Sequence, residues 1–289
     1  KTTTVSLLQR LYQAAGESDD AQLSCRFEDT RVIGTLTGSL TTPDPEDLYP
    51  LLASFVSEGC ENVVMEASSH ALALGKLDAL APEIAVFTNL TPEHLDFHGT
   101  MDAYFDAKLK LFRMARLGIA NADDPYFQRL AAGAACPIIS YSPSGGEADY
   151  RAAGIISHGT EGTSYTLEGP GISFDIFTQL CGSFNVANTL AAAVTALESG
   201  IPPEQTARVI AEFTSVKGRF ERVPTPGTGF DVFIDYAHTP DALENILRAA
   251  RGVVKPGGRL MVLFGCGGDR DPYKRPVMGR VASALADFT

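Results

Sequence analysis

Short apolar runs of strand length alternate with amphipathic stretches of helical length along most of this 289-residue chain. Strand-like runs lie within residues 61–70, 82–90, 231–239 and 258–271, and helical patterns lie within residues 103–118, 185–200 and 241–252. This alternation predicts βαβ units, and therefore an α/β fold with a mostly parallel sheet. Parallel sheets bind ligands in loops at the carboxyl ends of their strands. Polar clusters follow the apolar runs, at residues 66–70, 88–98, 235–239 and 265–271, so these loops are the candidate functional positions.

Two further features predict the domain organisation. Residues 142–180 are rich in Gly, Ser and Thr and contain β-like pieces at 162–169 and 172–180, which favours an antiparallel edge or hairpin added to the main sheet. A helical pattern at 201–213 precedes a hinge-like stretch, after which a new strand–loop–helix series begins. We therefore predict a boundary near Thr214, with one unit over residues 1–214 and a second over residues 215–289.

Composition excludes several classes of protein. The formal net charge of -12 argues against a general nucleic-acid binder, because a phosphate backbone requires a basic surface. Any anionic ligand must then be held by a local site. No apolar run is long enough to cross a bilayer and no secretory signal is visible, so we expect a cytoplasmic protein. The five cysteines show neither a CxxC pair nor zinc spacing, as expected in a reducing compartment.

The first residues, KTTT, are typical of the second half of a phosphate-binding loop. In the motif GxxxxGK[ST], backbone amides wrap the phosphates, the lysine neutralises the terminal ones and the hydroxyl holds magnesium. Lys1 and Thr2 would take the last two roles. A helical apolar pattern follows, and Gly16 is expected to end that helix. An ordinary helix capped by threonine is the alternative explanation.

Two polar clusters would complete such a site. Glu66 ends an apolar run, where a magnesium-binding carboxylate would lie close to the phosphate loop; the alternative is that it caps a helix. The loop after the next strand contains Asn89, His94, Asp96 and His98. A single His is more often structural, but two His with Asp and Asn on one loop after a buried strand favour a functional site.

Several long motifs occur in the order found in the Mur ligase family. They are MEASSHALALGKL, FTNLTPEHLDFHGTMDAYFDAKLKLF, NADDP, GSFNVANTLAA, KGRFERV, DYAHTPDAL and FGCGGDRDPYKRPVMG. The chain therefore resembles this family over nearly its whole length, and within it the branch that adds the third residue of the peptidoglycan stem peptide. The resemblance implies a central ATP-binding domain with a P-loop, followed by part of a Rossmann-like C-terminal domain. It also implies a fragment, in which the start of the P-loop and a domain for the UDP-sugar are absent.

The reaction implied by the resemblance is ATP-dependent amide-bond formation. The γ-phosphate would pass to the D-Glu carboxylate of UDP-MurNAc-L-Ala-D-Glu, and the amine of a diamino acid would then displace phosphate from the acyl phosphate. meso-Diaminopimelate is favoured over L-lysine, although the family's specificity motif would lie beyond Thr289. Such an enzyme uses ATP and Mg²⁺ and serves peptidoglycan synthesis, and with it cell wall biogenesis, cell shape and cell division. We expect a monomer that binds no nucleic acid.

The same resemblance assigns a catalytic set of Lys1, His94 and Lys108. Lys1 would contact the terminal phosphates, Thr2 and Glu66 would hold one magnesium ion, and His94 would hold a second. Lys108 matches the family lysine that carbon dioxide carbamylates, which turns a cation into a carboxylate-like ligand for the second ion. A free lysine with a pKa of ~10.4 would repel magnesium. A solvated helix lysine is the alternative, and we expect Lys110 to be one.

Further residues would bind the nucleotide and the substrates. The resemblance assigns adenine, ribose and phosphate contacts to Asn188, Arg219, Asp235 and His238, with Arg219 reaching the phosphates when the domains close. It assigns the substrates to Thr41, Thr42, Ser68, Lys76 and Arg270, the last of these for the diamino acid. The sequence departs from a common family pattern at Leu40, Leu74 and Lys76. Lys76 stands where arginine is usual, and lysine cannot form the bidentate fork of arginine with a carboxylate.

Three alternatives stay open. One is another Mur or folylpolyglutamate-type ligase, another is a non-catalytic nucleotide-binding or partner-binding module, and the last is a P-loop kinase or switch NTPase. The joint presence of Glu66, His94 and Lys108 argues against the non-catalytic module. A kinase or switch protein has no use for the hinge arginine and the second unit.

Overall fold

The fold is α/β, as predicted, in a computed structural model that describes residues 1–267 and 272–289. Within these residues the strands form three sheets. A parallel pair consists of β1 (Thr30–Ile33) and β2 (Asn62–Met65), and an antiparallel pair consists of β9 (Glu221–Val223) and β10 (Val232–Ile234). The main sheet has the order β3-β4-β5-β6-β7-β8, with bounds Ile84–Phe87, Leu117–Asn121, Ile138–Ser142, Tyr150–Ser157, Thr163–Gly169 and Ile172–Thr178.

The main sheet changes from parallel to antiparallel along its width. Strands β3 to β6 run parallel to one another, and β7 and β8 then add in antiparallel fashion. The β7–β8 pair is in continuous register from Thr163 opposite Thr178 to Gly169 opposite Ile172. The antiparallel addition predicted within residues 142–180 is therefore confirmed.

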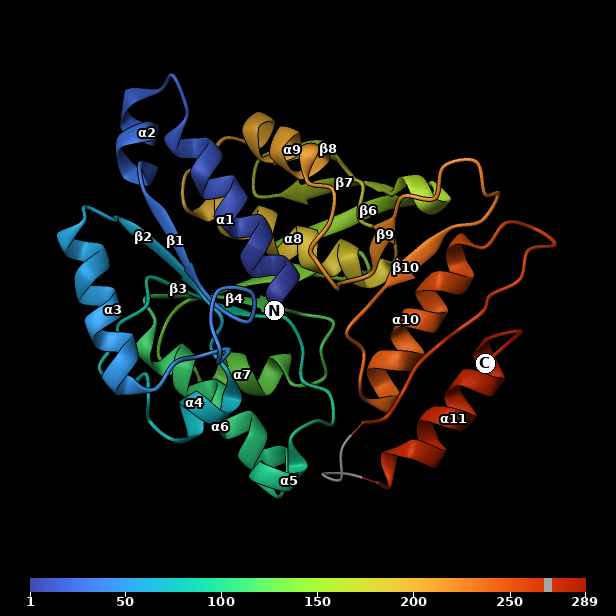
Figure 1. Cartoon of the computed structure of the whole chain (residues 1–289). Helices are drawn as coiled ribbons and strands as arrows, with labels where there is room; N and C mark the ends of the chain where they lie inside the picture. Colours follow the sequence, from blue (N-terminus) through green and yellow to red (C-terminus); the bar gives the residue numbers. More distant parts are fainter. Residues whose placement is uncertain (268–271) are drawn as a thin grey trace.

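Helices cover both faces of the sheets (Figure 1). One face packs against α1 (Thr2–Gly16), α8 (Ser183–Glu198) and α9 (Pro203–Glu212), and the other packs against α6 (Met101–Met114) and α7 (Phe127–Gly133). The pair β1–β2 lies beside α2 (Ala21–Phe27), α3 (Pro45–Ser57) and α4 (Ser69–Ala73) (Figure 1). A short helix, α5 (Leu95–His98), precedes α6, and a 3₁₀ turn, η1 (Gly159–Glu161), precedes β7.

Helix α1 packs into the hydrophobic core that it shares with α8, α9 and the main sheet, because its apolar residues recur at helical spacing and so lie on one face. Leu7 and Leu11 are fully buried, in one cluster with Leu190 of α8. The helix ends at Gly16, as predicted. A Cβ at this position would lie 2.2 Å from the carbonyl oxygen of Phe27, so the approach of α2 requires glycine here.

The described part of residues 215–289, the predicted second unit, contains β9, β10, α10 (Pro240–Val253) and α11 (Lys274–Leu285), and these two helices pack against each other. The strand predicted within residues 258–271 does not form in the described part of that stretch. Only Met261 pairs there, in a single bridge with Phe288, and Leu263 is 99% exposed. Strand hydrogen bonds need a neighbouring strand, so apolar composition alone does not produce one. None of the described helices is long and apolar enough to cross a membrane.

Candidate nucleotide and metal site

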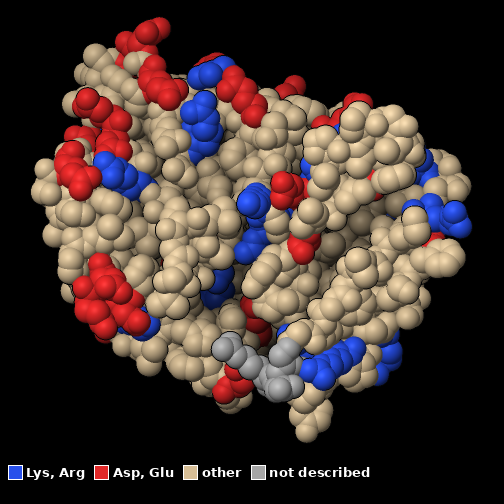
Figure 2. All heavy atoms as spheres, in the orientation of Figure 1, with Lys and Arg blue, Asp and Glu red and all other residues tan. Residues whose placement is uncertain are grey.

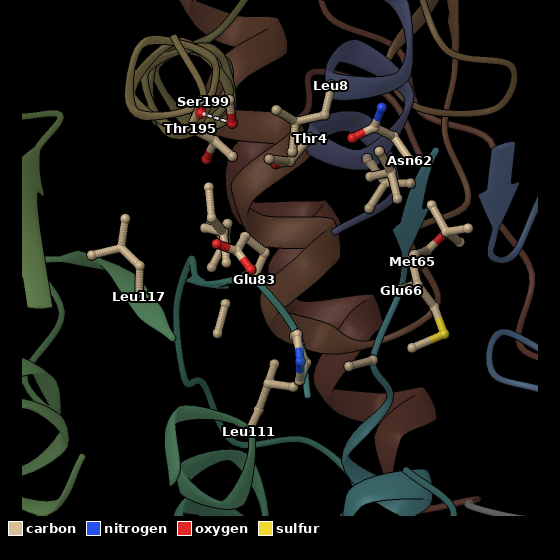
Figure 3. Close-up of a pocket in the computed structure, with 18 of the residues that line it drawn as sticks. Thr4, Leu8, Asn62, Met65, Glu66, Glu83, Leu111, Leu117, Thr195 and Ser199 are labelled. Atoms are coloured by element: carbon tan, nitrogen blue, oxygen red, sulfur yellow. Dashed lines mark hydrogen bonds between the residues drawn. The ribbon is translucent and has the colours of Figure 1, made fainter. Parts of the chain in front are cut away.

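The segments that carry the predicted residues meet where β2 and β3 end and α1 begins. Lys1, Glu66 and Lys108 line one cavity of about 560 Å³. Figure 3 shows this cavity, with Thr4 of α1 and Thr195 of α8 among the side chains around it. Strands β2 and β3 each lie at the edge of their own sheet and flank the cavity. Three residues that are far apart in the sequence are thus brought together.

Thr2, Glu66 and Arg219 form a continuous hydrogen-bonded chain. Thr2 Oγ1 donates to Glu66 Oε2 at 3.2 Å, and Arg219 Nη2 donates to Thr2 Oγ1 at 3.1 Å. Glu66 is only 3% exposed and directly follows β2. On the face seen in Figure 2, Lys and Arg side chains occupy the hollow beside the start of α1. A chain with net negative charge therefore has a local basic site.

The Thr2–Glu66 pair fits a magnesium ion. Magnesium prefers oxygen ligands and is usually held by one or two carboxylates together with waters and substrate phosphates. A threonine hydroxyl and a buried carboxylate in contact supply that kind of donor set. Among the described residues no group of three or more His, Cys, Asp or Glu could hold a metal, so phosphate or water oxygens would have to complete the ion's shell.

Neither of the helix-capping alternatives is correct. The N-cap of α1 is Lys1, with no side-chain capping bond, so α1 is not capped by a threonine. The N-cap of α4 is Ser68, whose Oγ accepts from the amide of Ala71 at 3.2 Å, so Glu66 does not cap that helix either. Both positions are therefore left for other roles.

Lys108 lies on α6 and points to the loop after β3. Its Nζ donates to the carbonyl oxygen of Asn89 at 3.0 Å and lies 5.2 Å from the ring centroid of Tyr104. Burial lowers the pKa of Lys108 to about 8. An amine with this pKa is substantially neutral near pH 8, which is the form that reacts with carbon dioxide.

Lys110 is not the solvated lysine that we expected. It is half-buried, and its Nζ donates to the carbonyl oxygens of Leu72 and Ala73 at 3.1 and 3.3 Å. These carbonyls belong to the last turn of α4, and that of Leu72 also accepts from the amide of Gly75 at 3.3 Å. Lys110 therefore joins α6 to α4.

His94 is the N-cap of α5 and has a left-handed backbone, at φ 58° and ψ 26°. Its ring lies 4.8 Å from that of His70, and its Nε2 lies 3.6 Å from Glu93 Oε1. Burial lowers the pKa of His94, which favours the neutral imidazole that metals bind. The Tyr104 ring centroid lies 6.1 Å from the His94 ring and 5.2 Å from Nζ of Lys108, and a carbamate on Lys108 would be needed to attract a cation here.

The residues predicted for the UDP-sugar peptide surround the end of β2. Thr42 is buried, donates from Oγ1 to the carbonyl of Glu66 at 2.7 Å and accepts from the amide of Ser68 at 3.0 Å. Thr41 lies beside Thr35, with 3.2 Å between their hydroxyl oxygens. Lys76 forms an ion pair with Asp44, two residues after Thr42 in the chain.

The residues predicted for adenine and ribose fall in two places. Asn188 of α8 accepts from Thr4 Oγ1 at 3.3 Å, which places it beside the start of α1. Asp235 follows β10 and accepts from the amides of Phe220 and Ala237 at 2.8 and 2.7 Å, and the ring of the next residue, Tyr236, has its centroid 5.7 Å from the guanidinium carbon of Arg219. His238 is exposed, and its Nδ1 lies 3.0 Å from the carbonyl oxygen of Tyr236. Arg270 lies outside the described residues.

Three residues at this site were not singled out from the sequence. Thr35 donates twice to Glu66, and His70 packs against the ring of His94. Asp124 is buried and accepts from the amide of Leu90, which fixes the start of the loop after β3. His70 lies in the motif SSH and Asp124 lies in the motif NADDP, so the sequence contained a signal for these two residues. No local pattern distinguishes Thr35 from the neighbouring threonines.

Comparisons with known proteins agree with this arrangement. The family model described as Mur ligase middle domain matches residues 1–196, and the model described as Mur ligase, glutamate ligase domain matches residues 218–289. UDP-N-acetylmuramoyl-L-alanyl-D-glutamate–2,6-diaminopimelate ligase of Streptomyces coelicolor is 43% identical, over 99% of this chain and 56% of its own length. The ligase of the same name from Synechococcus elongatus is 40% identical, over 99% of this chain and 57% of its own. The chain thus spans little more than half the length of these relatives.

Solved structures show the same fold. A UDP-N-acetylmuramoyl-L-alanyl-D-glutamate–2,6-diaminopimelate ligase superposes with a TM-score of 0.76 at 31% identity, over 100% of this chain and 59% of that one. The MurF ligase of Thermotoga maritima, in complex with ADP, has a TM-score of 0.70 at 15% identity, over 98% of this chain and 63% of that one. At that identity the likeness concerns the fold alone.

Proposed function

Because the chain belongs to the Mur ligase family, we propose that this protein is an ATP-dependent ligase that adds a diamino acid to UDP-MurNAc-L-Ala-D-Glu. meso-Diaminopimelate is the favoured amino acid, since relatives at about 40% identity are named for it. The enzyme would act in the cytoplasm, as a monomer, in peptidoglycan precursor synthesis. We also propose that residues 1–214 form its ATP-binding domain and residues 215–289 belong to its C-terminal domain.

The observation that most supports this proposal is the hydrogen-bonded chain of Thr2, Glu66 and Arg219 beside a cavity that Lys1 and Lys108 also line. Phosphoryl transfer needs positive charge and a metal-binding oxygen pair at one place, because catalysis of this step consists mostly of positioning and charge neutralisation. Lys1 and Arg219 would supply the positive charge, and Thr2 with Glu66 would hold magnesium. When bound, magnesium neutralises charge on the transferring phosphoryl group.

The reaction would proceed in two steps, a phosphoryl transfer followed by an acyl substitution. An oxygen of the D-Glu carboxylate forms a bond to the γ-phosphorus of ATP while the bond to the bridging oxygen breaks and ADP leaves. The amine of the diamino acid then attacks the acyl carbon, and the bond from this carbon to the phosphate oxygen breaks, so that phosphate and one proton are released. Lys1 binds the terminal phosphates in the first step, and Arg219 can follow them when the units close.

The remaining predicted residues would position the reactants. Thr41, Thr42, Ser68 and Lys76 would contact the UDP-sugar peptide, and Arg270 the incoming amino acid. Asn188, Asp235 and His238 would bind the adenosine part of ATP. Carbamylated Lys108 and His94 would hold the second metal ion. A ligase of another specificity is the second candidate, because the folylpolyglutamate synthetase of Lactobacillus casei shares the fold, with a TM-score of 0.67 at 14% identity.

The test is phosphate release by the full-length protein with ATP, Mg²⁺ and UDP-MurNAc-L-Ala-D-Glu, with either diaminopimelate or lysine added. We expect release that depends on diaminopimelate. Lys108→Arg keeps the positive charge but cannot form a carbamate, so it should lower the rate at least 100-fold. Lys110→Arg is the matched control on the same helix, keeps donors for the two carbonyls and should retain most of the activity. Folded protein that binds ATP but releases no phosphate with either amino acid would contradict the proposal.

A further inference from the structure

Thr35 holds both carboxylate oxygens of Glu66. Its backbone amide donates to Oε1 at 2.9 Å, and its hydroxyl donates to Oε2 at 3.2 Å. Thr35 follows β1 and Glu66 follows β2, and the parallel pairing of these strands places the two residues side by side. The residue that follows the neighbouring strand, β1, therefore donates a hydrogen bond to each oxygen of the Glu66 carboxylate.

Gly34 lets the backbone after β1 approach the Glu66 side chain closely enough for these two hydrogen bonds. A Cβ at Gly34 would lie 2.7 Å from Oε1 of Glu66 and 3.0 Å from its Cγ, so any side chain here would push on the carboxylate. The turn that presents Gly34 is fixed by Thr37, whose hydroxyl accepts from the Gly34 amide at 2.9 Å and donates to the Gly34 carbonyl at 3.1 Å. The Glu66 side chain is thus held by Thr35 in the conformation that contacts Thr2.

The direction of each hydrogen bond follows from the chemistry of the carboxylate. Ionised glutamate only accepts, so the hydroxyls of Thr2 and Thr35 must both donate to Glu66. The oxygen of Thr2 is then free to accept from Arg219, and the oxygen of Thr35 is free to accept from Thr41. A one-way chain therefore runs from Thr41 through Thr35 to Glu66, and a second runs from Arg219 through Thr2 to the same carboxylate.

We propose that Thr35 is a positioning residue that aims the carboxylate of Glu66 at Thr2. The inference rests on the proposed function, in which Thr2 and Glu66 hold magnesium. Without the hydroxyl of Thr35, Oε2 would lose one of its two donors, and the side chain could turn away from Thr2. Magnesium-dependent nucleotide binding would weaken, whereas nucleotide binding without metal would not change.

The test measures the affinity of the full-length protein for ADP by calorimetry, once with Mg²⁺ and once with EDTA. Thr35→Val keeps the shape and the backbone amide but removes the hydroxyl. We expect the gain in affinity that Mg²⁺ provides to fall about tenfold in this variant, because a hydrogen bond to a charged group is lost. The affinity in EDTA should stay at the wild-type value, and Thr35→Ser, which restores the hydroxyl, should recover the gain.

Thr166→Val is the matched control. Thr166 on β7 also donates from its hydroxyl to a carboxylate, Oδ1 of Asp175 at 2.8 Å, and this pair lies outside the site. It should bind ADP like the wild type under both conditions. If Thr35→Val fails to fold, Gly34→Ala replaces it, because the added methyl group displaces Glu66 and should cause the same selective loss.

Three outcomes would overturn the inference, and each has a different meaning. If Mg²⁺ increases the affinity for ADP equally in Thr35→Val and in the wild type, the role of Thr35 is contradicted but the metal site is not. A wild-type protein that binds ADP without any Mg²⁺ gain contradicts the proposed Thr2–Glu66 metal site and the inference with it. An equal loss of affinity with and without metal would also contradict the role, since it indicates general disruption of the site.

Discussion

Lys108 and Lys110 show how two residues of one type acquire different roles on a single helix. They lie two positions apart on α6 and therefore point to nearly opposite sides of the helix. Lys108 faces the loop after β3, where its amine contacts only one carbonyl, and Lys110 faces the end of α4, where it contacts two. The motif AKLKLF identified Lys108 through a family resemblance, but the role of Lys110 depends on a helix 37 residues away in the sequence. Local spacing therefore did not reveal it.

We expect Lys108 to titrate near pH 8 rather than at its ordinary value. Burial lowers its pKa in the folded state, so the folded protein binds fewer protons than the unfolded chain between about pH 8 and 10.5. The cost of the buried charge is fully present below pH 8 and is relieved as the pH rises toward 10.5. Titration of ¹³C-dimethylated lysines by NMR, in buffer free of carbon dioxide, measures this directly. The signal that disappears in Lys108→Arg should have a midpoint near 8, and a midpoint above 10 would contradict the burial argument.

At the scale of elements, patterns with strong periodicity predicted the structure well. Helices α1, α6, α8, α9 and α10 formed where amphipathic spacing indicated them, and the antiparallel strands β7 and β8 formed where Gly, Ser and Thr separate β-like runs. The run at 258–264 is also apolar, but its only strand-like pairing with a described residue is the bridge between Met261 and Phe288. The strand predicted there from apolar composition was therefore wrong. Helix α5 was not predicted either; it has only four residues, and its N-cap, His94, has a left-handed backbone that sequence patterns rarely indicate for a non-glycine residue.

Helix α6 depends on its N-cap for the placement of Lys108. Thr100 Oγ1 accepts from the amide of Ala103 at 3.1 Å and satisfies one free donor of the first turn. Thr100→Ala should lower the free energy of unfolding by about 1 kcal/mol, whereas Thr100→Ser should stay within about 0.5 kcal/mol of the wild type. Urea unfolding of the three proteins measures the difference. Equal losses in both variants would indicate that the methyl group, rather than the capping bond, stabilises α6.

At the scale of the whole molecule, long-range contacts connect the two units and could not be predicted from local patterns. Arg219 donates to Thr2 across 217 residues, and Arg222 donates to the carbonyl of Thr160 at 3.3 Å. The hinge function of Arg219 was predicted from its place in GRFE, yet its partner depends on how the second unit docks. That docking rests on a cluster in which Phe220 packs between Phe184 of α8 and Phe233 of β10.

Phe220 holds the second unit against the first through both its ring and its backbone. Its ring is 6% exposed, stacks on Phe233 at 4.5 Å and lies edge-on to Phe184 at 5.9 Å. Its backbone has a φ of 46°, which is strained for an aromatic residue, and the bond from its amide to Asp235 supports this conformation. Arg219 is its chain neighbour, so the position of this ring also sets the reach of the arginine to Thr2.

Phe220→Ala should therefore loosen the contact between the units rather than only weaken one core. Loss of a buried aromatic ring costs about 3 kcal/mol or more, and here the loss falls on the cluster that joins the units. Scanning calorimetry should show residues 215–289 unfolding in a separate transition at lower temperature. Phe230→Ala is the control, since that ring is 59% exposed and should leave one transition at the wild-type temperature. A single transition in Phe220→Ala, shifted as a whole, would mean that the other contacts suffice to hold the units together. The hinge would then have to close around the nucleotide through those contacts, without the ring of Phe220.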